Sequence, residues 1–225
     1  MFELNEQAMK VINLGGTNSV LNNYIAQMRD SRIQKDSLRF RTNMERTGEV
    51  FAYEISKTLE YSAKDVNTPL GIASVETLDT KVVIGTILRA GLPLQQGLQR
   101  VFDGAESAFL SAYRKHGKGD YFEIRADYCT TPPLTGKTLI LADALLATGA
   151  SMEAGLKKLE EEGGVPARIH LVCPIASQYA VDSLSIKMDD DVTLWVAAID
   201  PELTGHSYII PGLGDAGDLA FGGKS

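Results

Sequence analysis

The chain has 225 residues, of which 44% are hydrophobic and 23% are charged, so it can form one sizeable globular domain. Its net charge of -7 and the lack of a long Lys/Arg run argue against a nucleic-acid-binding surface. No apolar run approaches the roughly 18 residues of a membrane span and no signal-peptide pattern is present, so we expect a cytoplasmic protein without membrane contact.

Helical spacing of apolar residues predicts two helices near the N-terminus. The first covers residues 19–28. The second begins at Asp36 or Ser37, either of which can cap it, and runs to about residue 59. Together they define an N-terminal helical segment over residues 1–60.

Short apolar runs that follow predict strands. They alternate with helical patterns after residue 90, which is typical of a parallel sheet covered by helices on both faces. We therefore predict an α/β fold in a single domain, 1–225. The predicted strands are 70–78, 81–88, 106–113, 120–128, 136–144, 167–176 and 192–200, and the predicted helices are 92–100, 151–162 and 178–187.

One strand-to-helix connection carries a candidate anion site. Asp143 ends a predicted strand, and the small residues of "ATGAS", 147–151, lead into a helix. Backbone N–H groups and a helix N-terminus can bind a phosphate there. An ordinary turn with Ser151 as N-cap explains the same residues. The spacing matches neither a Walker A loop nor GxGxxG.

A resemblance to a known family favours the phosphate site. The segment "DALLATGAS", 143–151, resembles the 5-phosphoribosyl-1-diphosphate (PRPP) motif of type I phosphoribosyltransferases. It is most similar to the uracil phosphoribosyltransferase form, D-P-M-L-A-T-G-G-S. Similar segments follow the family order along almost the whole chain: "MRDSRIQKDSLRFR", "ILRAGL" and the tail "AIDPELTGHSYIIPGLGDAGDLAFGGK". The tail is the most specific of these motifs.

The resemblance implies roles for individual residues. Asp143 would bind the ribose hydroxyls, Arg89 and Arg114 the diphosphate, and all three would be catalytic. The PRPP-binding set would be Arg89, Arg114, Asp143, Ala147, Thr148, Gly149, Ala150, Ser151 and Asp215. The uracil-binding set would be Tyr208, Ile209, Gly214, Asp215 and Ala216, in a C-terminal hood over about 198–225. We expect the polar loop at 115–120, next to Arg114, to be mobile.

The implied activity is pyrimidine salvage, with uracil and PRPP converted to UMP and diphosphate. Mg²⁺ would be bound mainly through PRPP and water, with no dedicated protein metal site. The resemblance also implies a homo-oligomer, a dimer or tetramer, and GTP as a candidate effector. A non-catalytic regulator that binds UMP or PRPP, or an enzyme of this class for another base, stays open as an alternative.

Two departures from the family form lie inside the PRPP motif. Ala144 replaces a proline, which leaves the empty loop looser. Ala150 replaces a glycine and requires a negative φ.

We assign no chemistry to the remaining candidates. Cys129 and Cys173 lack metal or redox spacing and are interpreted as buried residues in a reducing compartment. His116, His170 and His206 show no metal spacing. We interpret His170 as a core histidine, and His206, next to the tail, stays open as a residue that lines the site.

Overall fold

The structure is a computed structural model that describes residues 9–116 and 122–223. Its centre is an eight-stranded sheet with the order β1-β10-β9-β7-β4-β5-β6, and the short β8 pairs with β9. Neighbouring strands are parallel except β5 and β6. The strands are β1 (Lys10–Asn13), β4 (Val82–Leu88), β5 (Glu106–His116), β6 (Phe122–Thr130), β7 (Thr138–Ala142), β8 (Leu145–Leu146), β9 (Arg168–Ser177) and β10 (Val192–Asp200).

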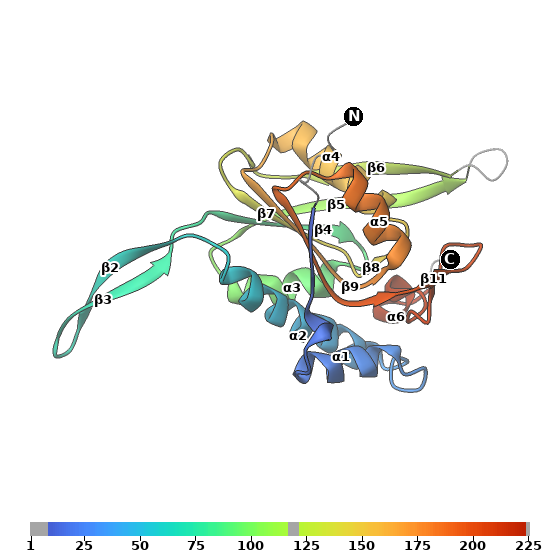
Figure 1. Ribbon diagram of the computed structural model, residues 1–225, viewed down its shortest axis with the longest axis horizontal. Coiled ribbons are helices and arrows are strands. Elements are labelled where there is room, and N and C mark those ends of the chain that lie inside the picture. The colour runs from blue at the N-terminus through green and yellow to red at the C-terminus, as the bar shows by residue number, and fades with distance from the viewer. Residues whose placement is uncertain (1–8, 117–121, 224–225) are drawn as a thin grey trace, which may run out of the picture.

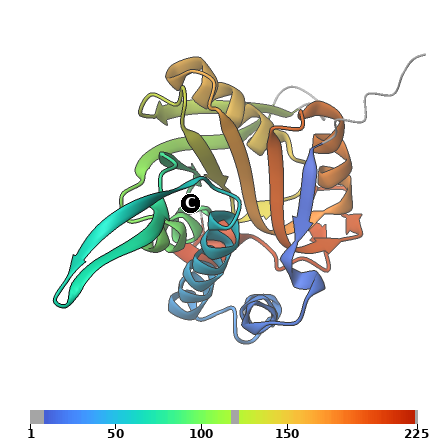
Figure 2. The ribbon, with the colours of Figure 1, turned by 60° about the vertical axis from the view of Figure 1, so that its left-hand side comes forward.

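Helices cover both faces of this sheet, as Figures 1 and 2 show. One face packs against α1 (Val20–Arg29), α2 (Ser37–Ser56) and α3 (Leu92–Val101). The other packs against α4 (Ala150–Gly163) and α5 (Gln178–Lys187). Successive strand residues serve opposite faces: Val83 lies in one core cluster and Ile84 in the other. Burial on both faces explains why the strands are almost purely apolar.

The predicted α/β class is confirmed, and the main corrections concern β1, β2 (Tyr61–Thr68) and β6. β6 runs antiparallel to β5, so the sheet is not wholly parallel. β1 was not predicted, because four residues give too short a pattern. β2 was also missed, and it pairs with β3 (Gly71–Leu78) as an antiparallel hairpin outside the sheet. Exposure of every β2 residue removes the apolar alternation that predicts a strand.

The hood follows β10 at the carboxyl ends of the parallel strands. It contains the two-stranded pair β11 (Glu202–Leu203) and β12 (Ile209–Ile210), then the short helix α6 (Ala216–Phe221). Figure 1 shows these elements together beside the ends of β8 and β9. The hood therefore lies at the edge of the sheet where ligands bind in open α/β folds.

A buried ion pair attaches the hood to the rest of the fold. Arg29, the last residue of α1, donates to both carboxylate oxygens of Asp200, at 2.7 and 2.8 Å. Arg29 also donates to the Gly212 carbonyl at 2.9 Å, and the Gly212 N–H donates to Asp200 at 2.9 Å. Only 7% of the Asp200 side chain is exposed, so its charge depends on these partners rather than on water.

Asp200→Asn is expected to lower the free energy of unfolding by about 3 kcal/mol, because the half-buried Arg29 guanidinium loses its counter-charge. Glu54→Gln is the control, since the Glu54–Lys57 pair at 2.7 Å is on the surface. It should cost less than about 1 kcal/mol. Urea unfolding measures both, and similar losses in the two variants would contradict the assigned importance of the Asp200 pair.

Candidate active site

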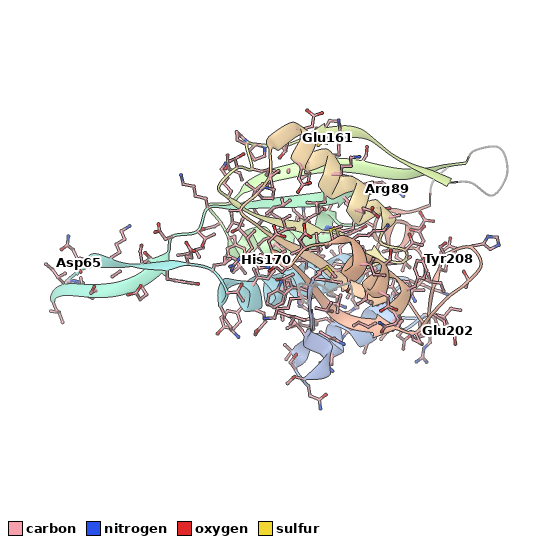
Figure 3. The ribbon with its side chains drawn as sticks, turned by 45° about the horizontal axis from the view of Figure 1, so that its top comes forward. Asp65, Arg89, Glu161, His170, Glu202 and Tyr208 are labelled. Carbon is pink, nitrogen blue, oxygen red and sulfur yellow. The ribbon has the colours of Figure 1, made fainter. Side chains whose placement is uncertain are left out.

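A pocket of about 410 Å³ opens between the hood and the carboxyl ends of the strands. Four separate segments of the chain meet around it. They contribute Ala90, then Asp143, Ala144, Leu145, Ala147 and Ser151, then His206, Ser207, Tyr208 and Ile209, and finally Gly214, Asp215 and Ala216. Figure 3 shows Arg89 and Tyr208 at this end of the molecule, far from Asp65 on the β2–β3 hairpin.

The connection from β7 to α4 forms one wall of the pocket. Gly149 has φ +80° and precedes α4, a conformation that glycine adopts without steric cost. Ala150 is the first residue of α4, and Ser207 is the only non-glycine with positive φ among the described residues. The condition that Ala150 has a negative φ is therefore met. Ala147 and Ser151 line the pocket, whereas Thr148, Gly149 and Ala150, which lie between them in the sequence, do not belong to its lining.

Asp143 projects into this pocket from the end of β7. Its Oδ1 accepts the Ala144 N–H at 2.7 Å, which is the hydrogen bond that a proline at 144 would lack. Burial raises the pKa of Asp143 to about 7, and the hydrogen bond from Ala144 partly offsets that rise. No Lys or Arg in the described ranges forms an ion pair with this carboxylate, so its charge is available to a ligand.

Arg89 lies just outside the pocket lining, next to Ala90. Its Nη2 donates to Asp218 Oδ1 at 3.4 Å and to the Gly222 carbonyl at 3.2 Å, both in or beside α6. The predicted diphosphate arginine thus lies at the rim of the pocket and contacts the hood.

The second predicted arginine belongs to a strand rather than to a loop. Arg114 lies in β5, where its backbone pairs with Ile124 of β6. The Arg114 side chain and residues 117–120 of the loop expected at 115–120 lie outside the described part of the chain. Residues 115 and 116 of that expected loop belong to β5 instead, because backbone pairing with β6 extends the strand past the apolar run "ESAFLSAY".

The hood supplies the opposite wall, and all five predicted uracil-binding residues line the pocket. Ile209 and Ala216 are buried, and Tyr208 is about half exposed. Gly214 has φ +94°, which favours glycine. The Asp215 side chain caps α6 by accepting the Asp218 N–H at 3.0 Å.

Sequence reasoning missed part of the lining. His206 was left open, and it lines the pocket together with Ser207, Leu145 and Ala144. Its position two residues before the predicted tail residue Tyr208 was the available signal. A left-handed φ of 60° at Ser207 turns the chain between β11 and β12.

The other candidates behave as structural residues. His170 is buried, and its Nδ1 accepts the Trp195 Nε1–H at 3.0 Å. Burial lowers the His170 pKa to about 4, so the ring is neutral near pH 7. Cys173 is buried, Cys129 is partly buried, and both are free. Within the described residues no three His, Cys, Asp or Glu side chains cluster closely enough to hold a metal ion, and no helix could span a bilayer.

Comparison with known proteins gives consistent results. Residues 17–223 match the family model described as uracil phosphoribosyltransferase. A uracil phosphoribosyltransferase of Porphyromonas gingivalis is 52% identical over 216 residues, which covers 96% of this chain and 100% of the relative. One from Methanothermobacter thermautotrophicus is 38% identical, covering 84% and 86% of the two chains. A solved protein structure from Aquifex aeolicus superposes with a TM-score of 0.84 at 27% identity, covering 94% and 98%.

The raised pKa of Asp143 gives a test that needs no substrate. Between its ordinary value of 3.8 and about 7 the folded protein binds more protons than the unfolded chain, so stability falls as pH rises through that window. Asp143→Asn removes this fall in stability with rising pH, because the amide does not ionise, and its oxygen still accepts the Ala144 N–H. The variant should be more stable than the parent by up to about 4 kcal/mol at pH 8 and nearly equal at about pH 4. Urea unfolding at both pH values measures it, and a difference independent of pH would contradict the assigned pKa.

Proposed function

Since the chain belongs to the uracil phosphoribosyltransferase family, we propose that the pocket between the β7–α4 connection and the hood is its active site. The protein transfers the 5-phosphoribosyl group from PRPP to uracil, giving UMP and diphosphate in pyrimidine salvage. The observation that carries the site assignment is the meeting of the PRPP motif and the tail motif, about 60 residues apart in sequence, around one pocket.

The β7–α4 connection is the proposed binding site for the 5′-phosphate. The 14-residue helix α4 begins here, and its first N–H groups have no helical carbonyl to bind. They and the Ser151 hydroxyl can donate to phosphate oxygens, and the helix dipole favours the negative charge. Thr148 and Ala150 would act through their backbone, since their side chains are not part of the lining.

Asp143 is the proposed partner of the ribose hydroxyls. Displacement at the anomeric carbon breaks the bond to diphosphate and forms a bond to a uracil ring nitrogen, which loses its proton. Positive charge develops on the ribose, and a carboxylate nearby stabilises it. Within the described residues, Asp143 has no ion pair and accepts only the Ala144 N–H, so the ribose hydroxyls would add further compensation for its charge.

The hood is the proposed uracil site. Uracil presents acceptor, donor and acceptor groups along one edge, and the main chain around Ile209, Gly214 and Ala216 can complement them. Cytosine presents a different edge and would leave buried polar groups unpaired, at about 1–3 kcal/mol each. Tyr208 would pack beside the base, and Asp215 would lie toward the ribose. The structure adds His206 to the residues around this base site.

The diphosphate is proposed to bind on the Arg89 side, with Arg114 as a second cation. Mg²⁺ would accompany PRPP and neutralise charge on the leaving diphosphate. Asp143 and Asp215 line the pocket and offer carboxylate oxygens, the donors that suit a hydrated Mg²⁺. Residues 1–225 would work as one domain, in the cytoplasm, where the free Cys129 and Cys173 stay reduced.

Asp143→Asn is expected to lower kcat by about 10²-fold or more, since one preorganised electrostatic group is typically worth that much.

Diphosphate release with uracil, cytosine and purine bases, with and without GTP, measures activity, base choice and effector response. Diphosphate release from PRPP with uracil, and with none of the other bases, supports the proposal. Turnover of another base identifies an enzyme for that base, and stabilisation by UMP without turnover identifies a regulator. Parent-like activity of Asp143→Asn contradicts the role of Asp143.

We also propose that the protein is a homo-oligomer of two or four copies. The β2–β3 hairpin supports this, because an isolated two-stranded hairpin is only marginally stable in water. It projects away from the sheet in Figure 1, and Leu70, Ile72 and Val75 are largely exposed at 101%, 73% and 46%. A second copy of the chain would cover these side chains.

Ile72→Asp should shift the protein to a smaller species in size-exclusion chromatography with light scattering, because it places a charge in the proposed interface. Glu76→Gln, at an exposed position of the same hairpin, is the control and should leave the mass unchanged. A monomeric parent protein would contradict the proposal.

A further inference from the structure

Two groups in and just beyond α6 accept hydrogen bonds from Arg89. Nη2 of Arg89 lies 3.4 Å from Asp218 Oδ1 and 3.2 Å from the Gly222 carbonyl oxygen. A Cβ placed on Gly217 would lie 3.9 Å from the same nitrogen and 3.9 Å from Ala90 Cβ. The first turn of α6 therefore lies close to the residues that follow β4. The Asp218 carboxylate and the Gly222 carbonyl, just beyond the helix, both accept from one side of the guanidinium.

The position of α6 is fixed from other directions as well. Arg41 of α2 donates to the Ala220 carbonyl at 2.6 Å, so an arginine binds each of two carbonyls near the C-terminal end of the helix. Cations at that end are favourable because the carbonyls there lack helical partners. Asp215 caps the other end. These contacts make α6 a defined support for Arg89 rather than a loose tail.

The geometry leaves most of the guanidinium available. Arginine has five N–H donors, and Nη2 carries two of them. In the described part of the chain the remaining three, on Nε and Nη1, have no hydrogen-bond partner within the protein. Arg89 can therefore keep its contacts with α6 and still present a fork to two oxygens of an anion.

We infer that Asp218, together with the Gly222 carbonyl, is a positioning residue that holds Arg89 toward the diphosphate of PRPP. This rests on the proposed role of Arg89. The exposed arginine would otherwise sample many rotamers, and ordering it on binding costs free energy. The restraint comes from the helix that carries the uracil-binding residues Asp215 and Ala216 at its start. Asp218 thus links the two halves of the site.

Steady-state kinetics of Asp218→Ala and Asp218→Asn test the inference. Asp218→Ala should raise the KM for PRPP about three- to fivefold, the range expected for one partly exposed ion pair, with kcat and the KM for uracil nearly unchanged. Asp218→Asn keeps an acceptor oxygen and should fall between Asp218→Ala and the parent. Glu161→Ala, at an exposed position on α4, is the control and should match the parent. Thermal unfolding checks that each variant is folded.

A double-mutant cycle with Arg89→Ala separates the possible outcomes. Arg89→Ala alone should raise the KM for PRPP by about 10-fold or more. Adding Asp218→Ala should then have no further effect, because Asp218 acts through Arg89. A normal KM for PRPP in Arg89→Ala would show that the diphosphate role of Arg89 is wrong. If Arg89→Ala is impaired, three results would overturn the positioning role of Asp218 alone. Asp218→Ala by itself could leave the KM for PRPP unchanged, or its effect could add to that of Arg89→Ala in the double variant. Asp218→Ala could also raise the KM for uracil as much as the KM for PRPP.

Discussion

The buried pairing of Arg29 with Asp200 is the interaction on which the site depends most. It joins the end of α1, the end of the last sheet strand and the Gly212 turn of the hood, three parts that are distant in sequence. The hood itself has only two very short strands and a six-residue helix, so it contributes little regular structure of its own. This attachment, together with the contacts of α6 to Arg41 and Arg89, fixes the hood wall of the pocket relative to the β7–α4 wall.

The pocket walls differ in what each can do chemically. The β7–α4 wall offers backbone N–H groups and the Asp143 carboxylate, while the hood wall offers a main-chain edge and apolar contacts. Burial makes Asp143 costly to ionise in the empty protein, and a ligand with hydroxyl donors and a developing positive charge reduces that cost.

Local sequence patterns predicted the fold where each element buries its own apolar face. The runs that became β4, β7, β9 and β10 are apolar because both faces are covered, and α5 was predicted at its observed bounds, 178–187. β2 could not be predicted because none of its residues is buried, and its strand conformation depends only on pairing with β3.

In the candidate site, too, residues within one local motif could be predicted, whereas contacts between distant segments could not. The motifs identified Asp143, Ser151 and the residues of 208–216 that line the pocket. Asp143 and Ser151 lie in one continuous motif, and residues 208–216 lie in another. The contact between Arg89 and Asp218 depends on how the hood folds back across 129 residues of sequence, which no local pattern encodes. The strand position of Arg114 likewise follows from pairing between β5 and β6.

We propose that one pocket binds the phosphoribosyl group on the α4 side and the base on the hood side. A crystal structure of the protein with UMP is the decisive experiment. We expect the phosphate at residues 147–151, the ribose beside Asp143, and the uracil edge against the main chain of 209–216. UMP bound elsewhere, or in the reverse orientation with its base at the start of α4, would contradict it.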